Sequence, residues 1–329
     1  MLVPPSHLPS ACPERRNRAE LFTWLLIAAL VPVVLVGLFV TGISLSLPSV
    51  ALSGAAAVAT FALSLFYTTR RPEPRIAAAL TALAQIIVFS ALGATFSYLI
   101  ATRGGTLWDA DLVRYDRMLG FDWHRYHVWA EERPLVRAAF TLAYASLKVQ
   151  MILAVALLGL TGRLLDLRSF VLAVVMSGLA AITISGFMPA FTMYEYLPLG
   201  TVERADAVGE AYVHALQSLR AGTFPLLDLA KAEGIVAFPS YHAALGLIFV
   251  RALWSVPWAR WPTVALNALL IAATPLDGGH FLVDVLGGLA IALVMILALP
   301  WASPRVRLAQ VLVQGGATGA GRSTLPAAG

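Results

Sequence analysis

The sequence is poor in charge and almost without cysteine. Only 12% of its 329 residues are Asp, Glu, Lys or Arg, whereas a soluble domain averages ~25%. The single cysteine, Cys12, excludes an intramolecular disulfide and any metal site built from several cysteines. Hydrophobic residues make up 59% of the chain, which is more than a soluble core can bury. The composition therefore indicates an integral membrane protein.

Apolar runs of roughly 20 residues, long enough for a helix to cross the hydrocarbon layer, recur along the chain. We expect an all-α integral membrane protein with about eight transmembrane helices. They lie near residues 21–45, 47–69, 76–101, 138–162, 169–192, 241–258, 262–277 and 280–302. This transmembrane domain, residues 21–302, follows an N-terminal segment at 1–20. A tail at 303–329 has no apolar periodicity, so we expect it to be disordered.

The basic residues mark one side of the expected bundle. With eight spans, the links that carry most of them fall on the same side; these residues are Arg15, Arg16, Arg18, Arg70, Arg71, Arg75, Arg163, Arg168, Arg260, Arg305 and Arg307. Cytoplasmic links are enriched in Lys and Arg, so we expect both termini to be cytoplasmic in a multi-pass protein of the plasma (inner) membrane. Two long loops, near 103–137 and 193–240, then face outward. This distribution also explains the net charge of +5 without a nucleic-acid partner.

The first outer loop is rich in aromatic residues. It carries Trp108, Tyr115, Trp123, Tyr126 and Trp129. Such amphipathic rings are typical of the headgroup zone of a membrane. We expect short interfacial helices here, either as a loop anchored at the interface or as a lid over a lipid site.

A histidine and an aspartate stand four residues apart at the start of the eighth span. On a helix, His280 and Asp284 would share one face, and the carboxylate would orient one imidazole nitrogen while the other acts as nucleophile or base. Gly278 and Gly279 would let the backbone approach a ligand closely, and the helix start would offer unpaired N–H groups to an anion. The alternative is a structural His–Asp pair that locks two helices together.

A second histidine opens the sixth span, in the segment Phe-Pro-Ser-Tyr-His that ends at His242. From His242 the chain crosses inward and then returns outward to His280. Both histidines therefore reach the same outer face, where they can converge on one substrate.

These residues carry a resemblance to a known family. Pro-Ser-Tyr-His at 239–242 and Gly-His-Phe-Leu-Val-Asp-Val-Leu-Gly-Gly at 279–288 resemble two motifs of the type 2 phosphatidic acid phosphatase superfamily. The chain is most similar to the branch that contains fungal inositol phosphorylceramide synthase and sphingomyelin synthase, over roughly residues 76–300. The resemblance implies a six-helix core of the phosphatidic-acid-phosphatase type.

The resemblance also implies a mechanism that needs no cofactor and no metal. His280 would attack phosphorus to form a phosphohistidine, and Asp284 would orient and charge it. His242 would protonate the leaving alkoxide and then deprotonate the acceptor. Ser240, Gly279 and nearby amides would stabilise the equatorial oxygens.

The basic residues that bind phosphate in the phosphatase branch are missing here. Ala273 and Thr274 stand where that branch has a Ser-Arg pair, and Met188 precedes Pro189 at the end of the fifth span, without a basic residue nearby. Similar losses are familiar in the transferase branch, so they favour phosphoryl transfer. The residues that could bind the phosphate instead are Lys148 with its neighbours Tyr144 and Gln150, and, in the second outer loop, Arg204, Arg220 and Lys231.

We therefore expect an enzyme, a membrane lipid-phosphate phosphotransferase or phosphatase that resembles inositol phosphorylceramide synthase. Its partners would be a phosphorylated lipid substrate, the surrounding membrane lipids and an alcohol acceptor if the reaction is a transfer. Two alternatives stay open. One is a proton-coupled transporter that uses the His–Asp pair as a relay, and the other is a catalytically inactive family member that binds lipid.

Overall fold

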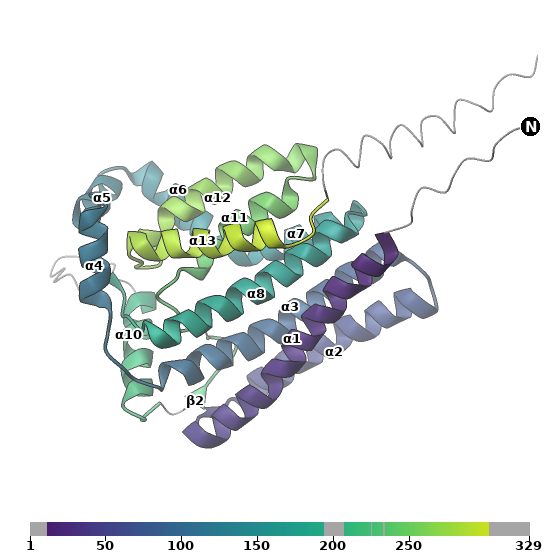
Figure 1. The fold of residues 1–329 in the computed structure, drawn as a ribbon, viewed down its shortest axis with the longest axis horizontal. Coiled ribbons are helices and arrows are strands. Elements are labelled where there is room, and N and C mark those ends of the chain that lie inside the picture. The colour runs from purple at the N-terminus through teal and green to yellow at the C-terminus, as the bar shows by residue number, and fades with distance from the viewer. Residues whose placement is uncertain (1–11, 194–206, 225, 233, 303–329) are drawn as a thin grey trace, which may run out of the picture.

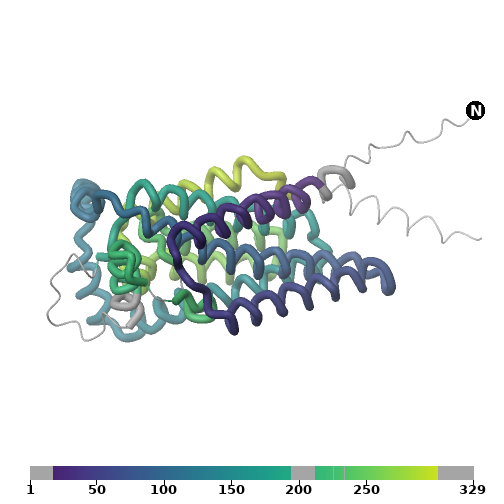
Figure 2. The backbone as a smooth tube through the Cα atoms, turned by 90° about the horizontal axis from the view of Figure 1, so that it is seen from below, coloured from purple at the N-terminus to yellow at the C-terminus, as the bar shows by residue number. Residues whose placement is uncertain are grey.

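The computed structural model describes residues 12–193, 207–224, 226–232 and 234–302. Long helices pack side by side along one axis (Figure 1), and a perpendicular view shows the same arrangement (Figure 2). They are α1 (Cys12–Thr41), α2 (Leu47–Thr69), α3 (Pro74–Ala101), α6 (Pro134–Ala145), α7 (Leu147–Leu160), α8 (Leu164–Phe187), α11 (Tyr241–Leu253), α12 (Pro257–Asp277) and α13 (Leu282–Ala298). The tail at 303–329, predicted to be disordered, lies outside the described residues.

The apolar helices make this an all-α, multi-pass membrane protein. Within the described residues, α1 from Arg18 onward, α2, α3 and α8 are each long and apolar enough to cross a bilayer. The predicted span at 138–162 is instead two helices, α6 and α7, bent by 54°, which together form a fifth candidate span. α11 and α13 are apolar but have only 13 and 17 residues. All eight predicted runs are helical, whereas length and composition support four or five spans.

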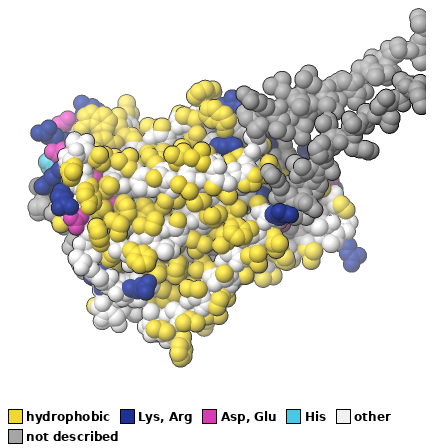
Figure 3. Space-filling model, in the orientation of Figure 1, with side chains coloured by type: hydrophobic (Ala, Val, Ile, Leu, Met, Phe, Trp, Pro, Cys, Tyr) yellow, Lys and Arg dark blue, Asp and Glu magenta, His cyan; other side chains and the backbone are white. Residues whose placement is uncertain are grey.

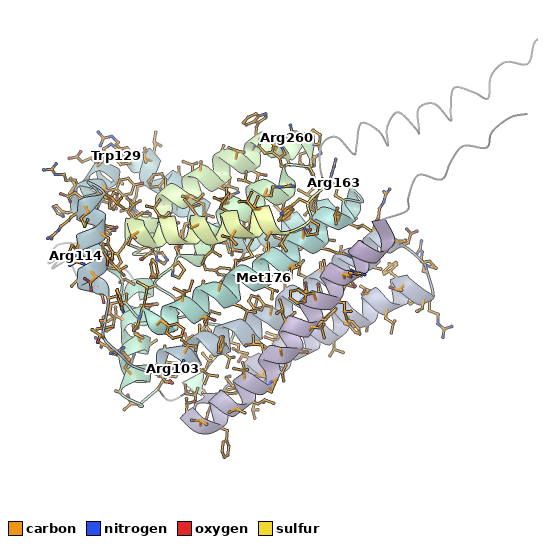
Figure 4. All side chains as sticks on the ribbon, in the orientation of Figure 1. Arg103, Arg114, Trp129, Arg163, Met176 and Arg260 are labelled. Carbon is orange, nitrogen blue, oxygen red and sulfur yellow. The ribbon has the colours of Figure 1, made fainter. Side chains whose placement is uncertain are left out.

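The two ends of the bundle differ in what they carry. At one end, α1 and α8 are joined by an ion pair with 2.8 Å between Arg168 Nε and Glu20 Oε2, and the amide of Ala302, just after α13, donates to Asp166. Arg163 and Arg260 lie toward this end, and Arg114 and Trp129 lie at the opposite one (Figure 4). Hydrophobic side chains cover the face between them (Figure 3). The ends of the described chain therefore share one end of the bundle, opposite the long loops.

Short helices form an outer layer over the loop end of the bundle. α4 (Asp109–Met118) and α5 (Trp123–Glu131) lie in the first long loop, and α10 (Ala207–Arg220) lies in the second. The helices expected in the first loop are thus present. However, Trp123 is only 3% exposed, and the Tyr126 hydroxyl donates to the Ala272 carbonyl in α12 at 2.8 Å. These two rings pack inward against α12, whereas Trp129 is 41% exposed; a position of the loop in the headgroup zone stays a prediction.

A two-residue strand pair ties the second long loop to the first helices. β1 (Ser44–Leu45) pairs in parallel with β2 (Leu226–Leu227). Farther along the same segment, the amide of Ile235 donates to Ser97 Oγ in α3 at 2.9 Å. The chain that leads into α11 is therefore fixed along α1–α3.

Candidate active site

The first half of the site is the turn at residues 278–281, between α12 and α13. Gly279 has a φ of +62°, in the left-handed region that glycine adopts without strain. A Cβ on Gly278 would lie 2.7 Å from His280 Cδ2 and 2.7 Å from the Tyr144 hydroxyl. The two glycines thus let the turn bring His280 close to Tyr144 of α6.

His280 and Asp284 form the predicted pair. His280 Nδ1 lies 3.2 Å from Asp284 Oδ2, and the same oxygen accepts the Phe281 amide at 2.9 Å. His280 is 7% exposed and Asp284 is fully buried. The geometry differs from the expected shared helix face, because α13 begins only at Leu282 and His280 precedes it. The contact is made across the first turn of α13.

The second half of the site is the start of α11. Ser240 is the N-cap residue, and its Oγ accepts the Ala243 amide at 3.4 Å. His242 lies in the first turn, with its ring stacked on Tyr144 at a centroid distance of 4.4 Å and an interplanar angle of 14°. Tyr144 therefore contacts one histidine and lies beside the turn that carries the other.

A close approach of α11 and α13 brings the two halves together. The Ser240 amide donates to the Asp284 carbonyl at 2.9 Å. A Cβ on Gly288 would lie 2.1 Å from the Ser240 carbonyl oxygen, so only glycine permits this separation. His242, His280 and Asp284 consequently converge at the loop end of the bundle.

Lys148 lies beside this cluster. It is in the first turn of α7, just after the bend between α6 and α7. Its side chain is exposed, and its charge lies close enough to act on His242. Of the basic residues considered for phosphate binding, Arg204 lies outside the described residues, Arg220 donates to the Gly105 carbonyl, and Lys231 is exposed.

Gln150 makes bonds between helices. Its side-chain amide donates to Ser146 Oγ at 2.9 Å, and its carbonyl accepts from Asn267 of α12 at 2.8 Å. These bonds pin α7 to α12 next to the bend. Gln150 as a substrate ligand stays a prediction, and the bonds give it a structural use.

The N-terminus of α13 does not offer its first amides to an anion, which corrects our expectation. The Leu282 and Val283 amides donate to the two carboxylate oxygens of Asp116 at 2.8 and 2.9 Å. The Phe281 amide donates a hydrogen bond to the Asp284 carboxylate. Protein carboxylates occupy the positions where we expected a phosphate.

The sequence interpretation missed three residues around the turn. Asp116 caps α13, Trp123 Nε1 donates to the Pro275 carbonyl near the end of α12 at 2.9 Å, and Arg137 Nη1 lies 2.8 Å from both oxygens of Asp277. The signal for Arg137 was its spacing, because residues 137, 141, 144 and 148 are all polar and follow a helical repeat. Asp116 and Trp123 gave no comparable signal.

Comparison with known proteins identifies the family. A family model described as the PAP2 superfamily matches residues 110–298, more than half of the chain. The chain belongs to the PAP2 superfamily. Members are phosphoric ester hydrolases or phosphotransferases. The match includes both histidine segments and α4–α13, whereas α1–α3 precede it. No curated protein and no solved structure matched the chain.

Proposed function

We propose that this PAP2 protein is a lipid-phosphate phosphotransferase or phosphatase that works through a phosphohistidine at His280, on the outer membrane face. The observation that supports it most is the convergence of His242, on α11, with the His280–Asp284 pair at the start of α13. The substrate is an amphiphilic phosphate ester or diester, which reaches the site laterally from the membrane.

The first step forms the covalent intermediate. With Nδ1 facing Asp284, Nε2 of His280 attacks phosphorus, and the bond from phosphorus to the leaving oxygen breaks. Protonated His242 gives its proton to that oxygen as the alkoxide leaves. The carboxylate of Asp284 stabilises the positive charge that develops on the His280 ring.

The second step reverses these roles. His242, now neutral, accepts a proton from a hydroxyl group, whose oxygen attacks phosphorus and releases His280. Water as the acceptor makes the reaction a hydrolysis, and an alcohol makes it a transfer. The absence of the basic residues of the phosphatase branch favours transfer, as in the branch of inositol phosphorylceramide synthase.

Lys148 supplies the counter-charge for the phosphate in this proposal. It lies beside His242, in an apolar helix where a charged side chain is costly without a partner or function. The Ser240 hydroxyl and the main chain at Gly278 and Gly279 complete the surroundings of the phosphate.

Activity of histidine variants tests the proposal. Purified protein would be assayed with phosphatidic acid and with phosphatidylinositol in mixed micelles, with and without an added alcohol acceptor. His280→Ala should abolish turnover and His242→Ala should lower kcat by about 10²–10⁴-fold, the range for loss of a general acid–base group. His214, on α10, is exposed, so His214→Ala is the matched control and should keep full activity. Turnover by folded His280→Ala would refute the mechanism.

A further inference from the structure

The start of α13 is capped by a residue from another helix. Asp116 lies in α4, is 2% exposed, and accepts the Leu282 and Val283 amides with one carboxylate oxygen each. Usually the N-cap residue itself accepts such amides. Here that residue is Phe281, whose apolar side chain accepts no hydrogen bond. The cap must therefore come from elsewhere.

Because of this cap from α4, two different carboxylates bind the amides at the start of α13. The first N–H groups of a helix have no partner within the helix, and Asp284 is the nearest acidic residue in sequence. One Asp284 oxygen already accepts the Phe281 amide and faces His280. Because Asp116 accepts the next two amides, Asp284 stays directed at His280.

The same outer layer holds the other side of the turn. Trp123 of α5 donates to the Pro275 carbonyl at 2.9 Å, and Tyr126 donates to the Ala272 carbonyl at 2.8 Å. Burial and the nearby Asp277 carboxylate raise the pKa of Tyr126 to about 12, so its hydroxyl remains a donor at neutral pH. α4 and α5 therefore bond to both helices that flank residues 278–281.

We infer that Asp116 is a positioning residue for the reaction, and that α4–α5 form a fixed support for the His280 turn instead of a lid that opens over the site. This inference rests on the proposed function. Asp116 acts through the main chain of α13, which sets the position of His280 relative to Asp284 and His242. A displacement of about 1 Å at a reacting group can cost about 10²-fold in rate, so the cap matters for kcat and little for substrate affinity.

Asp116→Asn tests this role with a change of almost no volume. The carboxamide has a single acceptor oxygen, so it keeps one of the two amide bonds and turns an N–H₂ group toward the other donor. We expect kcat to fall by at least 10-fold and KM to stay within about twofold. The thermal midpoint should fall, because one buried amide loses its acceptor, while the protein stays folded. Asp111→Asn is the matched control, because Asp111 lies on the same helix with its side chain 45% exposed and paired with Arg114. It should leave kcat unchanged.

Trp123→Phe is the second variant. It removes the hydrogen bond to Pro275 and keeps an aromatic ring, so it should lower kcat several-fold with little change in KM. If Asp116→Asn does not fold, Trp123→Phe becomes the test of the inference. A wild-type kcat in folded Asp116→Asn, or in folded Trp123→Phe if that variant must decide, would overturn the inference. His280→Ala is assayed alongside. If it is inactive while Asp116→Asn has normal kcat, only the positioning role fails; if it is active, the proposed function fails.

Discussion

Tyr144 connects the two histidines at the scale of single residues. Its ring stacks on His242, and its hydroxyl would lie 2.7 Å from a Cβ on Gly278, as would His280 Cδ2. The ring thus packs against the proposed general acid–base group, whereas the hydroxyl lies next to the proposed nucleophile. These two contributions can be separated by substitution.

Tyr144→Phe keeps the stacked ring and removes only the hydroxyl, so we expect a loss of less than about 10-fold in kcat/KM. Tyr144→Leu also removes the stacking, which for an aromatic pair contributes about 0.5–1.5 kcal/mol. It frees the His242 ring to rotate, and its kcat should be clearly lower than that of Tyr144→Phe. Steady-state kinetics on both variants check this. Equal kcat values would show that the stacking does not position His242.

The convergence of the three residues proposed for the chemistry was predictable, and the contacts that support them were not. His242, His280 and Asp284 stand in short motifs whose residue types fit the reaction, and counting spans placed both histidines at one face. Asp116 contacts amides 166 and 167 positions away. Such a long-range cap leaves no local pattern in a single sequence.

At the scale of elements, the site depends on the close packing of α11 against α13. α11 and α13 approach each other where Gly288 faces the Ser240 carbonyl, and the Ser240 amide bonds to the Asp284 carbonyl there. This crossing holds the two halves of the site together. The bend between α6 and α7 interrupts a span predicted as one helix. It could not be predicted from the sequence because the apolar run continues through it.

Gly288→Ala should separate these helices. The added Cβ would lie 2.1 Å from the Ser240 oxygen, and overpacking of this kind lowers the free energy of unfolding by about 1–3 kcal/mol. Gly54→Ala on α2, where a Cβ meets nothing within 4 Å, is the matched control and should be neutral or slightly stabilising. Thermal unfolding in detergent measures both. A Gly288→Ala protein as stable as the control would contradict the close crossing.

At the scale of the whole molecule, the fold separates the end that holds both ends of the described chain from the proposed reactive end. The start of α1 and the end of α13 lie at one end of the bundle, and the start of α13 lies at the opposite end near α4 and α5 (Figure 1). The positive-inside rule predicts that the reactive end faces outward. Composition alone gave the membrane class, whereas the division of the fourth span and the inward packing of Trp123 depend on tertiary contacts.

The single cysteine makes this orientation easy to test. In a Cys12→Ser background, a membrane-impermeant maleimide should label Met118→Cys on α4 in intact cells, because Met118 is 77% exposed at the reactive end. Arg71→Cys, between α2 and α3, should react only after permeabilisation. The reverse labelling pattern would place the site on the cytoplasmic face.

Trapping of the covalent intermediate tests the central claim most directly. Purified protein would be mixed with a probe lipid labelled at phosphorus, phosphatidic acid or phosphatidylinositol, quenched without acid to preserve phosphohistidine, and mapped by mass spectrometry. During turnover, the mechanism predicts a phosphoryl group on His280 from phosphatidic acid, or a phosphoryl group that keeps its second ester from phosphatidylinositol. It predicts neither adduct in His280→Ala. Turnover with the phosphoryl group on another residue, or continuing in folded His280→Ala, would contradict it.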